Sequence, residues 1–123
     1  MLKIAICDDN EQHLQYTTSL VKKELASHLI EIMLFFDAEQ MLKTIDTEKK
    51  SPDIAILDIV LGKDNGIELA KQLNQLLPGC KIIFLTGYAD YASASYEADH
   101  IWFVLKSASE TYLGPGCFSR FGL

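Results

Sequence analysis

The chain has 123 residues, the size of a single domain, and about two-thirds of its unfolded surface can be buried without help from disulfides or structural metals. Acidic residues outnumber basic ones by 17 to 11, and the formal net charge of −6 argues against direct nucleic-acid binding. The three cysteines show neither a CxxC motif nor a zinc-ligand spacing, which predicts a reduced, cytoplasmic protein. No apolar run approaches the ~20 residues of a membrane span, so no membrane association is expected.

Five short apolar runs, most of them rich in Ile, Val or Phe, are typical of buried strands. They are Leu2–Cys7, Ile30–Phe36, Ile54–Leu57, Ile82–Leu85 and Ile101–Leu105. The second run contains Glu31, which favours a place at the edge of the sheet.

Helix-like segments with apolar residues on one face separate these runs. The first is expected from about Asn10 to Ser27, and the second carries Met41, Leu42 and Ile45. The third carries Ile67, Ala70, Leu73 and Leu77 and ends before Pro78 and Gly79, and a weaker fourth covers about Tyr91–Ala98. The alternation predicts an α/β, doubly wound parallel sheet with helices on both faces.

Residues 1–106 are expected to form the domain core, and residues 107–123 an atypical tail. The sequence "GPG" within the tail excludes a long helix, so a fifth helix is expected to be short or truncated. A natural end, a chain cut short and a segment foreign to the natural protein all stay open for this tail.

Polar side chains follow several predicted strands, at the edge where open parallel sheets bind ligands. They are Asp8, Asp9, Asp58, Thr86 and Lys106. Each has an ordinary explanation: Asp9 as a helix N-cap with Gln12, Asp58 in a turn, Thr86 at a strand exit, Lys106 as a solvated charge. Together they would be independent coincidences at one edge, which favours a functional site.

Clustered carboxylates repel one another unless a cation neutralises them, and oxygen ligands suit Mg²⁺. A metal beside Asp58 could hold the oxygens of a phosphoryl donor, with Asp58 as the nucleophile that becomes an acyl phosphate. Thr86 and Lys106 are then placed to bind the new phosphoryl oxygens.

These residues resemble the CheY-like receiver domain of two-component response regulators. The motifs are "DD" after the first strand, "LDIVLGKDNGIELA" around the third, "IIFLTGY" at the fourth and "FVLK" at the fifth. The resemblance implies a flavodoxin-like sheet of order 2-1-3-4-5, and Asp58 as phospho-acceptor for a sensor histidine kinase. It also implies Mg²⁺ bound by Asp9, Asp58 and the main-chain carbonyl of Val60, with help from Asp8.

The same resemblance places the phosphoryl group against Thr86 and Lys106 and makes Phe103 the aromatic switch residue. On phosphorylation, Thr86 is predicted to move and Phe103 to fill the space that it leaves. The stretch "YADYASASYEADHIWFVLK" is similar to LytTR-type transcriptional regulators. Ser107 departs from the family pattern, which has proline after the lysine, so the path after Lys106 is open.

Two further expectations concern lifetime and assembly. Val60 and Tyr88 should flank the path of an attacking water and slow hydrolysis of the aspartyl phosphate, unless they only pack the loops. Tyr91 and Tyr96, if exposed, are the expected homodimer contact on the fourth helix and fifth strand, whereas core and surface positions for Trp102 remain equal alternatives. DNA binding would require an output domain absent from this chain.

Two other functions stay open. An aspartyl-phosphate-forming hydrolase shares the metal and the nucleophile, but it usually carries D-x-D after the first strand and a cap domain. A receiver-like interaction module that is never phosphorylated has no need for the full set of acids, threonine and lysine. On the receiver interpretation, the chain catalyses only its own phosphorylation and dephosphorylation and is not otherwise an enzyme.

Overall fold

The computed structural model describes residues 1–86, Ala98 and the backbone of residues 102–105. Its strands are β1 (Leu2–Cys7), β2 (Ile30–Phe35), β3 (Ile54–Leu57), β4 (Val60–Leu61), β5 (Asp64–Asn65), β6 (Lys81–Thr86) and β7 (Trp102–Leu105). Its helices are α1 (Glu11–Glu24), α2 (Ala38–Glu48) and α3 (Gly66–Leu76). The predicted fourth helix and the 107–123 tail lie outside the described residues.

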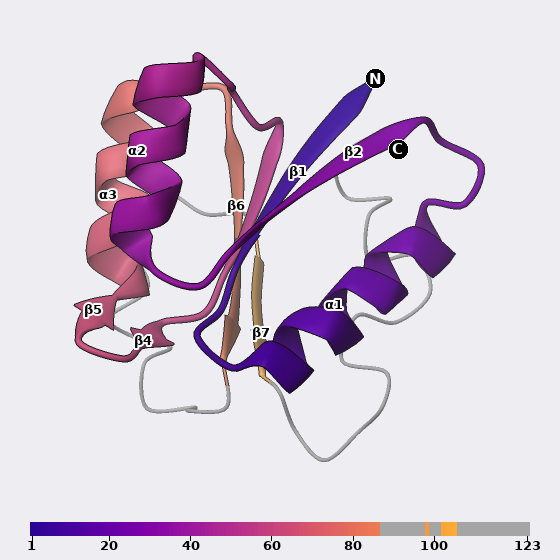
Figure 1. The fold of residues 1–123 in the computed structure, drawn as a ribbon, viewed down its shortest axis with the longest axis horizontal. Coiled ribbons are helices and arrows are strands. Elements are labelled where there is room, and N and C mark those ends of the chain that lie inside the picture. The colour runs from indigo at the N-terminus through magenta and orange to yellow at the C-terminus, as the bar shows by residue number, and fades with distance from the viewer. Residues whose placement is uncertain (87–97, 99–101, 106–123) are drawn as a thin grey trace.

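A parallel sheet of five strands in the order β2-β1-β3-β6-β7 forms the centre of the molecule (Figure 1). The predicted doubly wound sheet and its order 2-1-3-4-5 are therefore confirmed. Strand β2 lies at an edge, as Glu31 indicated, and only two of its six residues are buried. All four residues of the central strand β3 are buried, as expected for a strand covered on both faces.

Helices cover both faces of the sheet: α2 and α3 lie on one side and α1 on the other (Figure 1). Because side chains alternate along a strand, β1 sends Ala5 and Cys7 into the core beneath α2 and α3, and Ile4 and Ile6 into the core beneath α1. The site-bearing strands are thus held from both sides by packed apolar side chains.

Helix α1 begins one residue later than the proposed Asp9 cap would place it. Asn10 is the N-cap, and its side-chain oxygen accepts a hydrogen bond from the His13 N–H at 3.0 Å. The ordinary alternative for Asp9, a helix N-cap with Gln12, is therefore excluded. The helix also ends at Glu24, before the predicted Ser27, and the Leu25 N–H donates to Val21 O at 2.9 Å to close the last turn.

The other two helices follow their sequence signals. Asp37 caps α2 by accepting from the Gln40 N–H at 2.7 Å, and α3 ends at Leu76, before Pro78, as predicted. In the part of the chain that the structure describes, no helix has both the length and the hydrophobicity that a membrane crossing requires.

Candidate functional site

Three carboxylates meet at the carboxyl edge of the sheet. One oxygen from each of Asp8, Asp9 and Asp58 lies within 4.8 Å of the others. The first two follow β1 and the third follows β3, and these strands are neighbours in the sheet. Asp8 and Asp58 are only 3% and 8% exposed, whereas Asp9 is exposed, so the cluster is open to solvent on the side of Asp9.

Main-chain hydrogen bonds fix the position of Asp8. Its N–H donates to Phe35 O of β2 at 3.1 Å, which extends the β1–β2 ladder by one step. Its side-chain oxygen accepts from the Asn10 N–H at 2.9 Å, a turn that aspartate commonly forms with its own backbone two residues on. This turn brings Asn10 to the start of α1 and leaves Asp9 at the surface.

Asp58 is held in the same way at the end of β3. Its N–H donates to Cys7 O of β1 at 3.0 Å, and its side-chain oxygen accepts from the Val60 N–H at 3.2 Å. The turn that the sequence offered as an ordinary role for Asp58 is therefore present alongside the carboxylate cluster. The hydrogen bond to Val60 uses one side-chain oxygen, Oδ1.

A small hairpin that the sequence analysis missed follows Asp58. Strands β4 and β5 pair antiparallel, with Val60 opposite Asn65 and Leu61 opposite Asp64. Gly62 at the turn has φ +61°, a left-handed conformation that glycine adopts without strain. The sequence "GKDN" is a turn signal of this kind, but two-residue strands are too short to produce a visible alternation.

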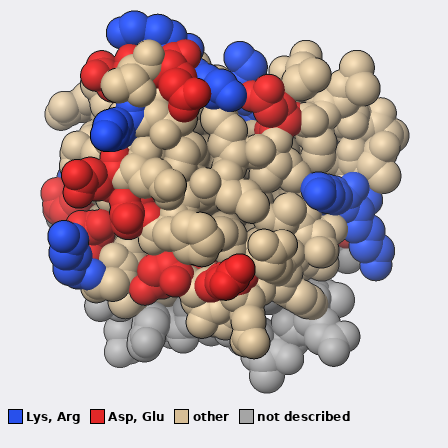
Figure 2. Space-filling view, in the orientation of Figure 1, with Lys and Arg blue, Asp and Glu red and all other residues tan. Residues whose placement is uncertain are grey.

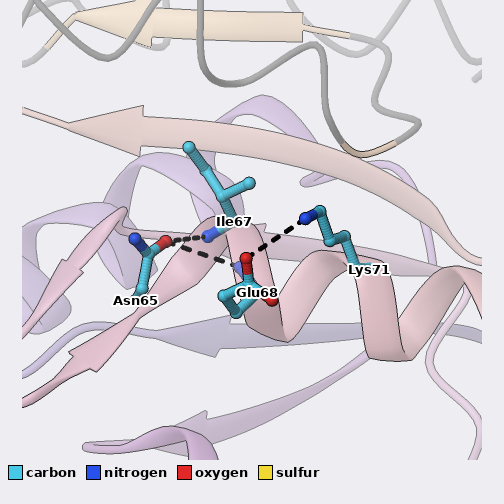
Figure 3. Close-up of polar contacts among 4 residues, drawn as sticks. All are labelled: Asn65, Ile67, Glu68 and Lys71. Carbon is cyan, nitrogen blue, oxygen red and sulfur yellow. Dashed lines mark hydrogen bonds and ion pairs between the residues drawn. The ribbon is translucent and has the colours of Figure 1, made fainter.

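The hairpin leads directly into α3, whose first residues are tightly bonded. The Asn65 side-chain oxygen accepts from the N–H groups of Ile67 at 2.7 Å and Glu68 at 3.4 Å (Figure 3). One turn further on, Lys71 forms an ion pair with Glu68 at 3.1 Å (Figure 3). The Gly66 N–H donates to Ile59 O at 2.7 Å, which ties the helix start to the residue after Asp58.

Acidic side chains surround the Cys7 thiol at this edge of the sheet and contribute to its raised pKa. Burial raises the pKa of Cys7 to about 12, with further contributions from Asp37, Asp8, Asp58 and Asp64. On the face shown in Figure 2, Lys and Arg are scattered at the margins and form no continuous basic patch. With this raised pKa the buried Cys7 thiol is the protonated form at neutral pH, which is a poor nucleophile.

The donor set fits a hard divalent cation. All three side chains offer carboxylate oxygens, and two of them are buried, so the mutual repulsion is only weakly screened by water. Oxygen donors suit Mg²⁺, which keeps several water ligands and binds few carboxylates. Asp9 is exposed, so solvent can reach the cluster from that side.

The remaining predicted site residues are described to different extents. Thr86 is fully buried at the carboxyl end of β6, opposite Leu105 of β7 in the ladder. Lys106 follows Leu105 in the sequence but lies outside the described residues, as does Tyr88. The backbone of Phe103 pairs with Phe84, and its side chain is outside the described part.

Comparisons with known proteins identify the fold and the family. Residues 4–114 match the model of the response regulator receiver domain. The chain belongs to this family. It is the receiver domain of a two-component response regulator, and its fold class is CheY-like, as the sequence motifs indicated.

Among curated relatives, the sensory transduction protein LytT of Bacillus anthracis is 33% identical over 89% of this chain and 43% of its own length. LytR of Streptococcus agalactiae is 30% identical over 85% of this chain and 42% of its own length. These relatives bear out the similarity to LytTR-type regulators. The chain spans less than half the length of these two relatives.

Solved structures show the same fold. The response regulator TrrA of Thermotoga maritima, determined in complex with Mg²⁺-BeF, is 31% identical and aligns with a TM-score of 0.71 over 92% of this chain and 93% of its own. The BeF3-activated receiver domain of DrrB aligns with a TM-score of 0.81 over 100% of this chain and 99% of its own, at 20% identity.

Proposed function

We propose that Asp58 accepts a phosphoryl group from a sensor histidine kinase, with Mg²⁺ held by Asp8, Asp9 and Asp58. The observation that carries the proposal is the convergence of the three carboxylates within 4.8 Å at the edge between β1 and β3. The main-chain carbonyl of Val60 is proposed as a further ligand on the resemblance to the family; the Val60 N–H bond to the Asp58 side chain at 3.2 Å places this residue beside the carboxylates.

In the transfer step, a carboxylate oxygen of Asp58 attacks phosphorus and forms the acyl phosphate. The P–N bond of the donor phosphohistidine breaks, and its electron pair stays on the imidazole nitrogen, which takes a proton from water. Bound Mg²⁺ supplies positive charge to the phosphoryl oxygens and to the carboxylates. The Val60 N–H holds one oxygen of Asp58, and an oxygen of this carboxylate lies within 4.8 Å of one from Asp9.

Thr86 and Lys106 are proposed to bind the phosphoryl oxygens after transfer. Thr86 is buried at the end of β6, where its hydroxyl faces a protein interior of low dielectric and a hydrogen bond to an anion is strong. In the proposed switch, Thr86 moves toward the new charge and Phe103 fills the space that it leaves. This movement is proposed to change the surface formed by β7 and the fourth helix. That surface is also the proposed homodimer contact.

Val60 and Tyr88 are proposed to set the lifetime of the acyl phosphate by excluding water. Val60 is half-buried in β4, directly beside the acceptor turn. Autodephosphorylation of Val60→Asn and Tyr88→Glu should be faster than in the wild-type domain. Unchanged rates in both variants would limit these side chains to packing.

DNA binding is proposed to lie in the part of the LytT and LytR relatives beyond the matched region. The receiver domain itself has a net charge of −6, which opposes contact with phosphates. Its output would be a change in surface shape that alters its contacts with a linked domain.

Incubation with acetyl phosphate and Mg²⁺, followed by intact mass measurement, tests the proposal. The domain should gain one phosphoryl group, and neither Asp58→Ala nor a sample with excess EDTA should do so. Asp46→Ala, at an exposed position on α2, is the matched control and should be phosphorylated like the wild type. No mass gain would favour a module that is never phosphorylated, and turnover of a general phosphatase substrate would favour a hydrolase.

A further inference from the structure

Gly66 lies where the start of α3 touches the main chain of the acceptor residue. A Cβ atom added at this position would overlap the carbonyl oxygen of Asp58. It would also lie 2.8 Å from the Cα of Ile59 and 2.9 Å from the carbonyl carbon of Asp58. All three neighbours are backbone atoms, so no side-chain rotation can relieve the overlap.

The surrounding hydrogen bonds leave the backbone of Asp58 little freedom to retreat. On one side, its N–H is bonded to Cys7 O of β1 at 3.0 Å. On the other, the Gly66 N–H is bonded to Ile59 O at 2.7 Å, which ties the first residue of α3 directly to the residue after the acceptor. The acceptor is thus confined between the first residue of α3 and the end of β1.

We infer that Gly66 is a positioning residue: the absence of its side chain sets the distance of the Asp58 carboxylate from Asp8 and Asp9. Any side chain at position 66 would push the 58–59 peptide away from α3 and pull one member out of the three-carboxylate cluster. Displacements of about 1 Å at a reacting group can lower rates about 100-fold. This inference rests on the proposed function for its phosphorylation readout and on the carboxylate cluster for its metal readout.

The other two glycines in the described part of the chain provide a contrast. A Cβ at Gly62 would lie 3.7 Å from Asp9 Oδ2, an ordinary contact distance, although the φ of +61° would strain any other residue. A Cβ at Gly79 would meet nothing within 4 Å. An added methyl group would therefore overlap backbone atoms at Gly66, strain the backbone at Gly62 and fit without contact at Gly79.

The test compares wild type, Gly66→Ala, Gly79→Ala and Asn65→Ala by thermal unfolding, by calorimetric titration with Mg²⁺, and by the acetyl phosphate assay at saturating Mg²⁺. Gly66→Ala should bind Mg²⁺ about 10- to 100-fold more weakly and should be phosphorylated more slowly even when saturated. Gly79→Ala should match the wild type in both. Asn65→Ala loosens the same helix start without adding an atom, so it should lose stability but keep Mg²⁺ affinity.

Two outcomes would overturn the inference. The first is Gly66→Ala with wild-type Mg²⁺ affinity and phosphorylation rate. The second is failure of Gly66→Ala to fold under conditions where Asn65→Ala folds, which would assign Gly66 to folding alone. If the wild type binds Mg²⁺ but takes no phosphoryl group, the proposed function fails, and the comparison of Mg²⁺ affinities still decides the role of Gly66.

Discussion

The loops after β1 and β3 each hold an aspartate at the end of a strand, but they do so by different contacts. In each, an aspartate at the strand end donates its N–H to a neighbouring strand and accepts from the N–H two residues on, at 2.9 Å for Asp8 and 3.2 Å for Asp58. After β1, a single cap residue, Asn10, separates the aspartates from α1. After β3, the chain first forms the β4–β5 hairpin and then returns to press Gly66 against the acceptor.

The difference indicates which changes each loop tolerates. The β1 loop is short, so the changes expected to affect it most are loss of the Asn10 cap and loss of a side-chain charge. The β3 loop is longer and is fixed by contact between its end and its beginning, so its weak point is the size of the residue at that contact.

The largest expected effect concerns the Cys7 thiol, which lies at the carboxyl edge between the two loops. Cys80 lies before β6 at the opposite edge, and the pKa of both thiols is raised from 9.0 to about 12, mainly by burial. In a Cys117→Ser variant, alkylation at pH 8 should therefore be about a thousandfold slower for these thiols than for an unfolded control, because thiolate is the reacting form. Rapid labelling of Cys7 in the folded protein would contradict its burial and the charge around it.

The same thiols give a pH dependence of stability. Their folded pKa lies above the unfolded value of 9.0, so the stability that comes from keeping them neutral is complete below pH 9. It should be lost as the pH rises from 9 toward 12. Urea unfolding at a series of pH values, with a Cys80→Ala variant that should show a shallower loss, measures this contribution.

An intermediate effect is expected from the exposed charge of the β1 loop. Asp9→Asn keeps the shape of the side chain but removes one anionic ligand, so Mg²⁺ affinity should fall about 10- to 100-fold. The metal-free domain should unfold at the same or a slightly higher temperature, because one repulsive charge is gone. Glu11→Gln, at the exposed start of α1, is the matched control; equal losses in the two variants would mean that only general charge matters.

The smallest effect compares the two caps. Asn10→Ala and Asn65→Ala should each lower the free energy of unfolding by about 1 kcal/mol. The loss at Asn65 should be the larger one, because its oxygen accepts from two N–H groups and that of Asn10 from one in the bonds described above. Chemical denaturation of the two variants tests this order. A larger loss in the free energy of unfolding for Asn10→Ala than for Asn65→Ala would contradict it.

The sequence predicts the sheet well because buried strands produce apolar runs and the alternation with helices restricts the topology to few choices. It also places Asp8, Asp9 and Asp58 at one edge, where the structure brings their oxygens together. The β4–β5 hairpin and the Asn10 cap were missed because they depend on hydrogen bonds of single residues, which leave no periodic pattern. The contact of Gly66 with Asp58 joins residues eight positions apart, and only the folded chain shows it.

The main-chain bonds from Asp8 to Phe35 and from Asp58 to Cys7 have a consequence for how this protein can change over time. They make strand alignment, rather than loop length, the property that decides which residue joins the carboxylate cluster. A one-residue slip of β1 would turn Asp8 into the opposite core and bring Cys7 or Asp9 to its place, since neighbouring side chains face opposite ways. Insertions and deletions should therefore accumulate in the connections at the opposite edge, while the length of β1 and β3 up to their terminal acids stays constant.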